Sequence, residues 1–312
     1  MFTDKASSLF LDLTTGRVVY HSPWNLRRFR VKYFLRTLVY PVTTFRYLSG
    51  ICEQNEYKYL LTKRAYLPAK IHRPYLFKGL SVSGRGKAIL SHYSFVQKLA
   101  EQGITSLFLR QEQQLLARFY GKDEACMELF CSPGYYDREG EITLSLHYNG
   151  NPVANMSLSF IEENNAMIAC IGGLQGPNSE EGQQLIRQAT RACYGVFPKK
   201  MLLDTLRVIA MQCGVSSLRA VGNKSHVFMK LRYFFSKKEH FVANYDEFWS
   251  SVGGTLGKHN LFSLPLTSAR KNLEDVASKK RAEYRKRYAL LDDVENQIMC
   301  TLGAENPVAE SL

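Results

Sequence analysis

Alternating apolar and polar residues between positions 125 and 171 constrain the fold of this 312-residue chain more than any other feature. Residues 142–148 and 154–160 place an apolar side chain at every second position, which is the period of a strand with one buried face. Asn149-Gly150, between them, is a strong signal for a hairpin turn. Residues 125–130 and 166–171 are also strand-like. We therefore expect an antiparallel meander of strands in this region.

A glycine-rich segment, Ile171-Gly172-Gly173-Leu174-Gln175-Gly176, ends the meander and leads into a helical run that starts near Glu180. Glycines allow another group to approach the backbone closely. That group is either a ligand phosphate, which amides at a helix start attract, or another piece of the same chain. Glu180 and Glu181 disfavour a phosphate there, and Asn178 with Glu181 forms an ordinary capping box. The residues leave both alternatives open.

The residues after the glycine segment predict several more elements. In order they are a helix that ends at Gly195, a helix from Pro198 to Gly214, a strand over 217–221, an aromatic segment over 228–235 and an amphipathic helix over 273–291. Together with the meander, this order predicts an α+β protein. We expect a central, mostly antiparallel sheet with helices packed on it and basic helical extensions at both ends.

The N-terminal region is predicted to be mainly helical. Ser22-Pro23 favours a helix start and Pro41 favours its end. The arginines of this helix lie on all sides of it, so its charged and apolar faces do not separate as they do in a membrane-surface helix. We expect the helix to pack on a domain with its arginines outward. Residues 81–87 are rich in Ser, Gly and basic residues but lack the Walker pattern, so a nucleotide site is rejected. A further helix is expected to open at His92-Tyr93.

These features divide the chain into three regions. Residues 1–124 form a mainly helical, basic region, residues 125–268 an α/β core, and residues 269–312 a basic C-terminal helix and tail. We expect the three regions to form one integrated unit.

The net charge of +13 is concentrated at the two ends of the chain. No acidic residue lies between Asp12 and Glu53, and residues 270–287 carry eight bases against three acids. Such ends suit a polyanion such as nucleic acid or anionic lipid, although charge also serves to keep a protein soluble. The residues predicted to bind a polyanion are Arg27, Arg28, Arg30, Lys279, Lys280, Arg281 and Arg285.

The sequence also predicts where the protein resides. No apolar run approaches the roughly twenty residues of a membrane span, and the N-terminus lacks the pattern of a signal peptide. The seven cysteines are odd in number and scattered, so we expect reduced thiols in the core of a cytoplasmic protein. Such a protein could also associate peripherally with the inner membrane. No His or Cys pair has ligand spacing, so no metal is expected.

The order of strands, glycine turn, helix and further strand is similar to that of Gcn5-type N-acyltransferases. In that family, amides after the fourth strand hold the cofactor's pyrophosphate, and an asparagine often follows the fifth strand. The resemblance implies an acyl-thioester cofactor of the coenzyme A type, with Gly172, Gly173, Gln175 and Gly176 as cofactor-binding candidates and Asn223 as a catalytic candidate. The glycine spacing after Gln175 departs from the family's usual motif.

Two histidines are the other candidates for acid–base chemistry. His226 follows Gly222-Asn223 and is expected to face a pocket at the end of a strand. His92 lies beside Tyr93 in a predicted helix, where a structural hydrogen bond is the simpler role. These candidates leave open whether the protein is an enzyme.

Six motifs span nearly the whole chain: Arg73-Pro74-Tyr75-Leu76, His92-Tyr93, residues 171–176, Phe248-Trp249, Leu264-Pro265 and the basic run from Lys279 to Tyr288. Together they resemble the VirK/YbjX family of enterobacterial proteins. The resemblance implies a cytoplasmic bacterial protein tied to virulence and envelope stress responses, with no settled activity. The leading hypothesis is an accessory protein of this type, either acyltransferase-like or a degenerate relative without catalysis. The alternative is a regulatory protein that binds RNA, DNA or anionic lipid.

Overall fold

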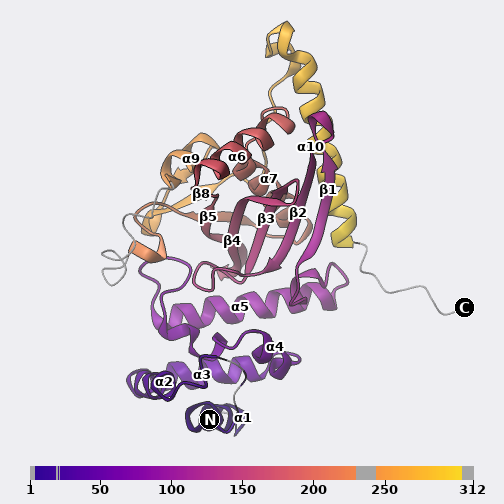
Figure 1. The fold of residues 1–312 in the computed structure, drawn as a ribbon. Helices are drawn as coiled ribbons and strands as arrows, with labels where there is room; N and C mark the ends of the chain where they lie inside the picture. The colour runs from indigo at the N-terminus through magenta and orange to yellow at the C-terminus, as the bar shows by residue number, and fades with distance from the viewer. Residues whose placement is uncertain (1–3, 19, 21, 230–243, 304–312) are drawn as a thin grey trace, which may run out of the picture.

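An eight-stranded sheet forms the centre of the computed structural model, which describes residues 4–18, 20, 22–229 and 244–303 (Figure 1). The strand order is β1-β2-β3-β4-β5-β6-β8-β7. Every neighbouring pair is antiparallel except β5 and β6, which are parallel. The strands are β1 Gln114–Tyr120, β2 Cys126–Pro133, β3 Ile142–Tyr148, β4 Asn151–Glu163, β5 Ala166–Gln175, β6 Ser217–Val221, β7 Thr255–Leu256 and β8 Leu261–Leu264.

The predicted α+β class and the meander are confirmed. Strands β2 to β5 follow one another in the sheet, and Asn149 and Gly150 turn between β3 and β4 with positive φ angles. A hairpin of this kind requires φ above zero at both central residues, which Asn and Gly tolerate best. Strand β1 was missed, because its burial does not alternate and its register shifts between Leu115 and Ala117.

The helices pack around this sheet, with α1, α2 and α3 lying beyond α5 on the side away from the strands (Figure 1). A short 3-10 helix, η1 (Leu67–His72), follows α4. The α-helices are α1 Asp4–Thr15, α2 Arg27–Val39, α3 Pro41–Cys52, α4 Tyr57–Lys63, α5 Val82–Glu101, α6 Glu180–Ala192, α7 Pro198–Gln212, α9 Tyr245–Ser251 and α10 Ser278–Gly303.

Two predicted helix starts near the N-terminus are wrong. Helix α2 begins at Arg27 rather than at Ser22-Pro23, and Pro41 ends α2 but also occupies the first turn of α3. Helix α5 begins well before His92, because the Ser81 hydroxyl accepts a hydrogen bond from the Gly84 amide at 3.0 Å. The Ser- and Gly-rich segment is therefore the capped first part of a helix.

Two further predictions need correction. The cap of α6 is Ser179, whose hydroxyl accepts from the Gly182 amide at 3.1 Å, one residue beyond the predicted capping box. The buried face of α10 is formed by Leu290, Val294, Ile298 and Leu302, so the predicted stripe lay too close to the N-terminus. The predicted aromatic segment falls largely on residues 230–235, which lie outside the described residues.

Two apolar cores stabilise the fold. The larger core lies between the sheet and helices α6, α7 and α10, and it includes the end of α5. The smaller core lies among α1 to α5 and reaches the sheet at Cys170 of β5. Among the described residues, the buried acids Glu139 and Glu141 lie in the connection between β2 and β3, and the buried Lys70 lies in η1.

Candidate functional site

The connection between β2 and β3, residues 134–141, places three carboxylates inside the protein. Glu139 and Glu141 are buried, and Asp137 is half-buried. Buried charges are costly unless they are paired and hydrogen-bonded, so the partners of these carboxylates identify the polar sites of the fold. Asp137 and Glu141 face the N-terminal helices, whereas Glu139 faces β5.

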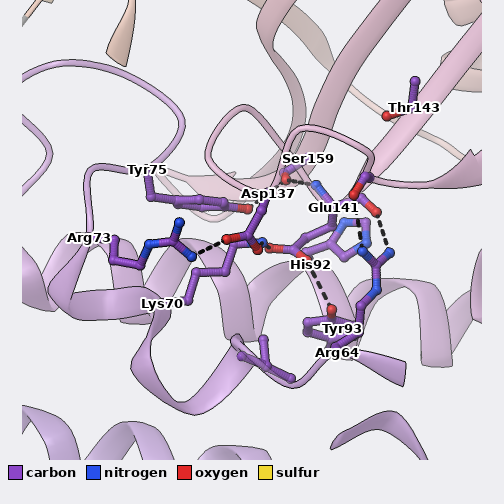
Figure 2. Close-up of polar contacts among 12 residues, drawn as sticks. Arg64, Lys70, Arg73, Tyr75, His92, Tyr93, Asp137, Glu141, Thr143 and Ser159 are labelled. Atoms are coloured by element: carbon purple, nitrogen blue, oxygen red, sulfur yellow. Dashed lines mark hydrogen bonds and ion pairs between the residues drawn. The ribbon is translucent and has the colours of Figure 1, made fainter. Parts of the chain in front are cut away.

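The Glu141 cluster is centred on an ion pair between Lys70 of η1 and Glu141 (Figure 2). The Lys70 Nζ lies 2.6 Å from Glu141 Oε1 and 3.3 Å from Asp137 Oδ1, and the Tyr93 hydroxyl donates to Glu141 Oε2 at 2.9 Å. Arg73 pairs with Asp137 on the other side. The Lys70 and Glu141 side chains are only 3% and 1% exposed, so water contributes little to their solvation.

Arg64 extends this cluster to the backbone of the β2–β3 connection. Its guanidinium donates to the carbonyl oxygens of Gly134 and Glu141 at 3.2 and 3.1 Å. Burial alone raises the pKa of Glu141, but the positive charges of Lys70 and Arg64 lower it to about 2. The crevice beside the cluster has a volume of about 10 Å³, enough for about one water molecule. The cluster therefore ties the N-terminal helices to the sheet.

His92 lies at the edge of this cluster. Its Nδ1 accepts a hydrogen bond from the Phe160 amide at 3.2 Å, and its ring stacks on the Phe160 ring. Burial lowers the pKa of His92 to about 4, so the ring is neutral near pH 7. His92 thus makes a structural hydrogen bond between α5 and β4.

The Glu139 cluster consists of Glu139 and two of the predicted site residues, Gln175 and His226. Gln175 Nε2 donates to both Glu139 carboxylate oxygens at 3.0 and 2.9 Å, and His226 Nε2 lies 3.3 Å from Glu139 Oε1. The Phe228 amide donates to His226 Nδ1 at 3.4 Å. The Tyr245 ring stacks on His226 with centroids 5.5 Å apart.

Glu139 also explains the first two glycines of the glycine-rich segment. A Cβ atom at Gly172 would overlap the Glu139 carbonyl oxygen, and a Cβ atom at Gly173 would overlap Glu139 Oε2. Gly172 occupies a register shift between β4 and β5, and the pairing of β5 with β6 ends beside it at Ile171. Of the two alternatives that the sequence left open, a close approach by the same chain is therefore present at Gly172 and Gly173.

Asn223 and Gly176 lie near the cluster but have different contacts. The Asn223 amide donates to Asp246 Oδ1 at 2.8 Å, and its Oδ1 accepts from the Tyr245 amide at 2.9 Å, which joins the end of β6 to α9. A Cβ atom at Gly176 would lie 3.2 Å from the Val153 carbonyl oxygen.

The sequence could not predict Glu139, because an acid in a loop has no pattern that marks it as buried.

The basic residues predicted to bind a polyanion lie on two separate helices. Arg27 and Arg28 are exposed on α2, whereas Arg30 is half-buried and donates to the Thr15 carbonyl oxygen at 3.3 Å. On α10, Lys279, Lys280 and Arg285 are exposed. Arg281 is half-buried and donates to the carbonyl oxygens of Val276 and Glu274 at 2.9 and 3.1 Å.

Helix α2 also exposes an unusual number of apolar side chains. At about 100° per residue, five of them fall within an arc of roughly 140°, opposite the buried Tyr33 and Thr37. Arg27 and Arg28 share this arc, and Lys32 borders it. The large apolar side chains of α2 and its flanks, each 42–67% exposed, are Leu26, Val31, Phe34, Leu35, Leu38, Val39, Tyr40 and Val42. The five in the arc are Val31, Phe34, Leu35, Leu38 and Val39, and with Arg27 and Arg28 they form the surface that we call the α2 face.

Metal sites and membrane spans were both sought in the part of the chain that the structure describes. Within it, no group of three or more His, Cys, Asp or Glu residues is arranged to hold a metal ion. Among the helices of the same residues, none has the length and apolarity needed to cross a membrane.

Comparisons with known proteins place the chain among bacterial relatives. The sequence model of a family described as "Protein of unknown function (DUF535)" matches residues 22–300. The chain is 34% identical to "Uncharacterized protein YbjX" of Escherichia coli K12, over 93% of this chain and 88% of that protein. It is 29% identical to an "Uncharacterized protein" of Haemophilus influenzae, over 86% and 88%. It is 24% identical to "Membrane protein LapB" of Mannheimia haemolytica, over 62% and 83%. No solved structure gives a significant match.

Proposed function

This chain belongs to the DUF535 family, a family of unknown function. We propose that the protein binds anionic lipid bilayers through the α2 face. The observation that carries the proposal is the α2 face itself, where exposed aliphatic side chains and arginines share one side of a helix. Five apolar side chains in one arc are more than a solvated helix needs.

The chemistry of the α2 face fits a lipid surface better than a nucleic acid. Apolar side chains enter the boundary between head groups and acyl chains, while long basic side chains reach the lipid phosphates. No acidic residue between positions 13 and 52 opposes that attraction. Each Lys or Arg near an anionic membrane contributes about 1 kcal/mol of binding free energy. A relative of Mannheimia haemolytica named as a membrane protein gives further support.

We expect the double substitution Leu35→Glu/Leu38→Glu to weaken binding to vesicles of phosphatidylglycerol and phosphatidylethanolamine by about tenfold or more, since burying one leucine contributes about 1.5–3 kcal/mol. Vesicle flotation measures the bound fraction. Both leucines are exposed, so the melting temperature should stay close to that of the unmodified protein.

The matched control is Leu109→Glu/Leu256→Glu, which changes charge equally at leucines 40% and 60% exposed outside α2. This control should bind vesicles normally. Equal losses in the two variants, or equal binding of the unmodified protein to neutral phosphatidylcholine vesicles, would count against the α2 face. Retained binding to RNA but not to vesicles would favour the nucleic-acid alternative.

A second candidate is acyl transfer from a coenzyme A thioester. The order β5, α6, α7, β6, with β5 and β6 parallel, supports a relation to Gcn5-type N-acyltransferases. Glu139 and His226, just beyond the end of the β5–β6 pairing, place a carboxylate beside an imidazole, two groups that can take part in acid–base chemistry. Glu139 already occupies the space against Gly172 and Gly173, so this candidate relies on Gly176 and the start of α6.

If the second candidate holds, millimolar acetyl- or palmitoyl-coenzyme A should raise the melting temperature of the protein, because a ligand that binds only the native state stabilises it. Gly176→Glu should abolish the rise, since a carboxylate there repels the pyrophosphate. Gly303→Glu, at the far end of α10, is the matched control and should keep it. An unchanged melt of the unmodified protein would exclude this candidate.

A further inference from the structure

Helices α7 and α10 enclose a cavity of about 410 Å³ together with the segment 266–271. Small-molecule sites commonly have volumes of about 300–1,000 Å³. No residue of the Glu139 or Glu141 cluster lines this cavity, and α2 contributes none of its walls. The cavity is therefore a separate site from those described above.

The inner wall of the cavity is apolar. It includes Met201 and Val208 of α7, and Leu291, Val294 and Ile298 of α10. All but Leu291 are buried, and Leu291 is half-buried against the same core. A wall of this kind favours a hydrocarbon chain, since removing apolar surface from water contributes about 25 cal/mol for each Å².

Charged residues, with a small excess of cations, border this apolar wall. The lining contains five basic residues, Lys200, Arg207, Arg270, Lys271 and Arg287, against the acids Asp204 and Glu295. Asp204 accepts from both Lys200 Nζ at 2.6 Å and Arg207 Nη1 at 2.8 Å. Arg270 also pairs with Asp292 and Glu295, and Arg287 with Glu283, so five cations face four acids among the described residues. The small excess of positive charge, with Lys271 at the rim, attracts an anion.

Two arginines of the rim are held in place by aromatic rings. The Arg287 guanidinium lies 4.3 Å from the centroid of Tyr284 and donates to the Tyr194 carbonyl oxygen at 2.7 Å. The Arg270 guanidinium lies 5.4 Å from the centroid of Tyr288 and pairs with Asp292 at 2.6 Å. An arginine ordered in this way loses less side-chain freedom when it binds an anionic group.

We propose that this cavity binds an amphiphile that has a single acyl chain and an anionic head group. The chain lies against Met201, Val208 and Ile298, and the head group lies at the rim near Arg270 and Lys271. A free fatty acid and a lysophospholipid share this chemistry. The site does not depend on the α2 face, because the two surfaces share no residue.

Isothermal titration with myristate and with lysophosphatidylglycerol, each below its critical micelle concentration, tests the site in the full-length protein. We expect at least one of the two to bind. Arg270→Gln/Lys271→Gln should weaken that binding by about tenfold or more, as the loss of charged contacts implies. The control Lys279→Gln/Lys280→Gln removes the same charge at exposed residues of α10 that do not line the cavity, and it should bind normally.

A second variant tests the apolar wall. Leu291→Trp should fill the cavity and weaken binding of the acyl chain. Binding of dodecyl maltoside, a neutral amphiphile, should be unaffected by Arg270→Gln/Lys271→Gln. Binding of myristate alone identifies a carboxylate site, and binding of lysophosphatidylglycerol alone identifies a phosphodiester site. Binding of neither, or equal losses in the two charge variants, would overturn the proposal.

Discussion

Replacing Lys70 by methionine is expected to lower the free energy of unfolding by about 3–5 kcal/mol. Lys70 is 3% exposed and pairs with both Glu141 and Asp137, so its removal leaves a buried carboxylate without its main counter-charge. Methionine keeps most of the side-chain volume, which limits the effect of a cavity. Urea denaturation followed by fluorescence measures the change, with Lys58→Met at an exposed site of α4 as the matched control.

The same substitution should change how stability depends on acid. The pKa of Glu141 is about 2 in the folded protein, below its ordinary value of 4.5. The stability that Glu141 contributes is therefore complete above about pH 4.5 and is lost as the pH falls toward 2. Lys70→Met removes a main cause of the lowered pKa of Glu141. The free energy of unfolding of the variant should therefore depend less on pH between about 4.5 and 2.

A third variant separates the ion pair from simple packing. Adding Glu141→Gln to Lys70→Met removes the unpaired charge, so the double variant should be more stable than Lys70→Met alone. If Lys70→Met were no more costly than Lys58→Met, the Glu141 cluster would not hold the N-terminal helices to the sheet.

The sequence predicted the sheet well where local patterns determine it. The alternation over 142–160 and the Asn149-Gly150 turn predict the antiparallel pairing of β3 with β4, so the meander followed directly. They did not predict the register shift between Leu146 and His147, or the burial of Thr143 and Ser145 on the polar face of β3. Strand β1 has no such alternation, and its place at the sheet edge depends on contacts with α10, a helix far away in the sequence. One such contact is the hydrogen bond from the Thr301 hydroxyl to the Leu116 carbonyl oxygen.

The candidate site could be predicted only in part. The sequence selected Gln175 and His226, and the fold places both beside Glu139, a residue that no pattern indicated. The α2 face was hidden for a different reason. Its apolar and basic residues share one solvent-facing side, so the helix lacks the separation of faces that marks an amphipathic helix. Only the packing of Tyr33 and Thr37 shows which side is outward.

Gly172→Ala should be the most damaging single methyl addition in the sheet, with a loss of about 3 kcal/mol of stability. The new Cβ would overlap the Glu139 carbonyl oxygen, a backbone atom of a connection anchored on both sides by hydrogen bonds. The φ angle of Gly172 lies outside the left-handed region, so the cost is steric rather than conformational. Thermal and urea unfolding measure the loss.

Gly173→Ala provides the comparison that identifies the cause. Its Cβ would meet the Glu139 carboxylate, the end of a side chain that can shift at the cost of its hydrogen bonds with Gln175, so we expect a smaller loss of about 1–2 kcal/mol. Gly303→Ala, where a Cβ meets no atom within 4 Å, should leave stability almost unchanged. If Gly172→Ala were as mild as Gly303→Ala, the β2–β3 connection would not lie against β5, and Glu139 would have no fixed place beside Gln175 and His226.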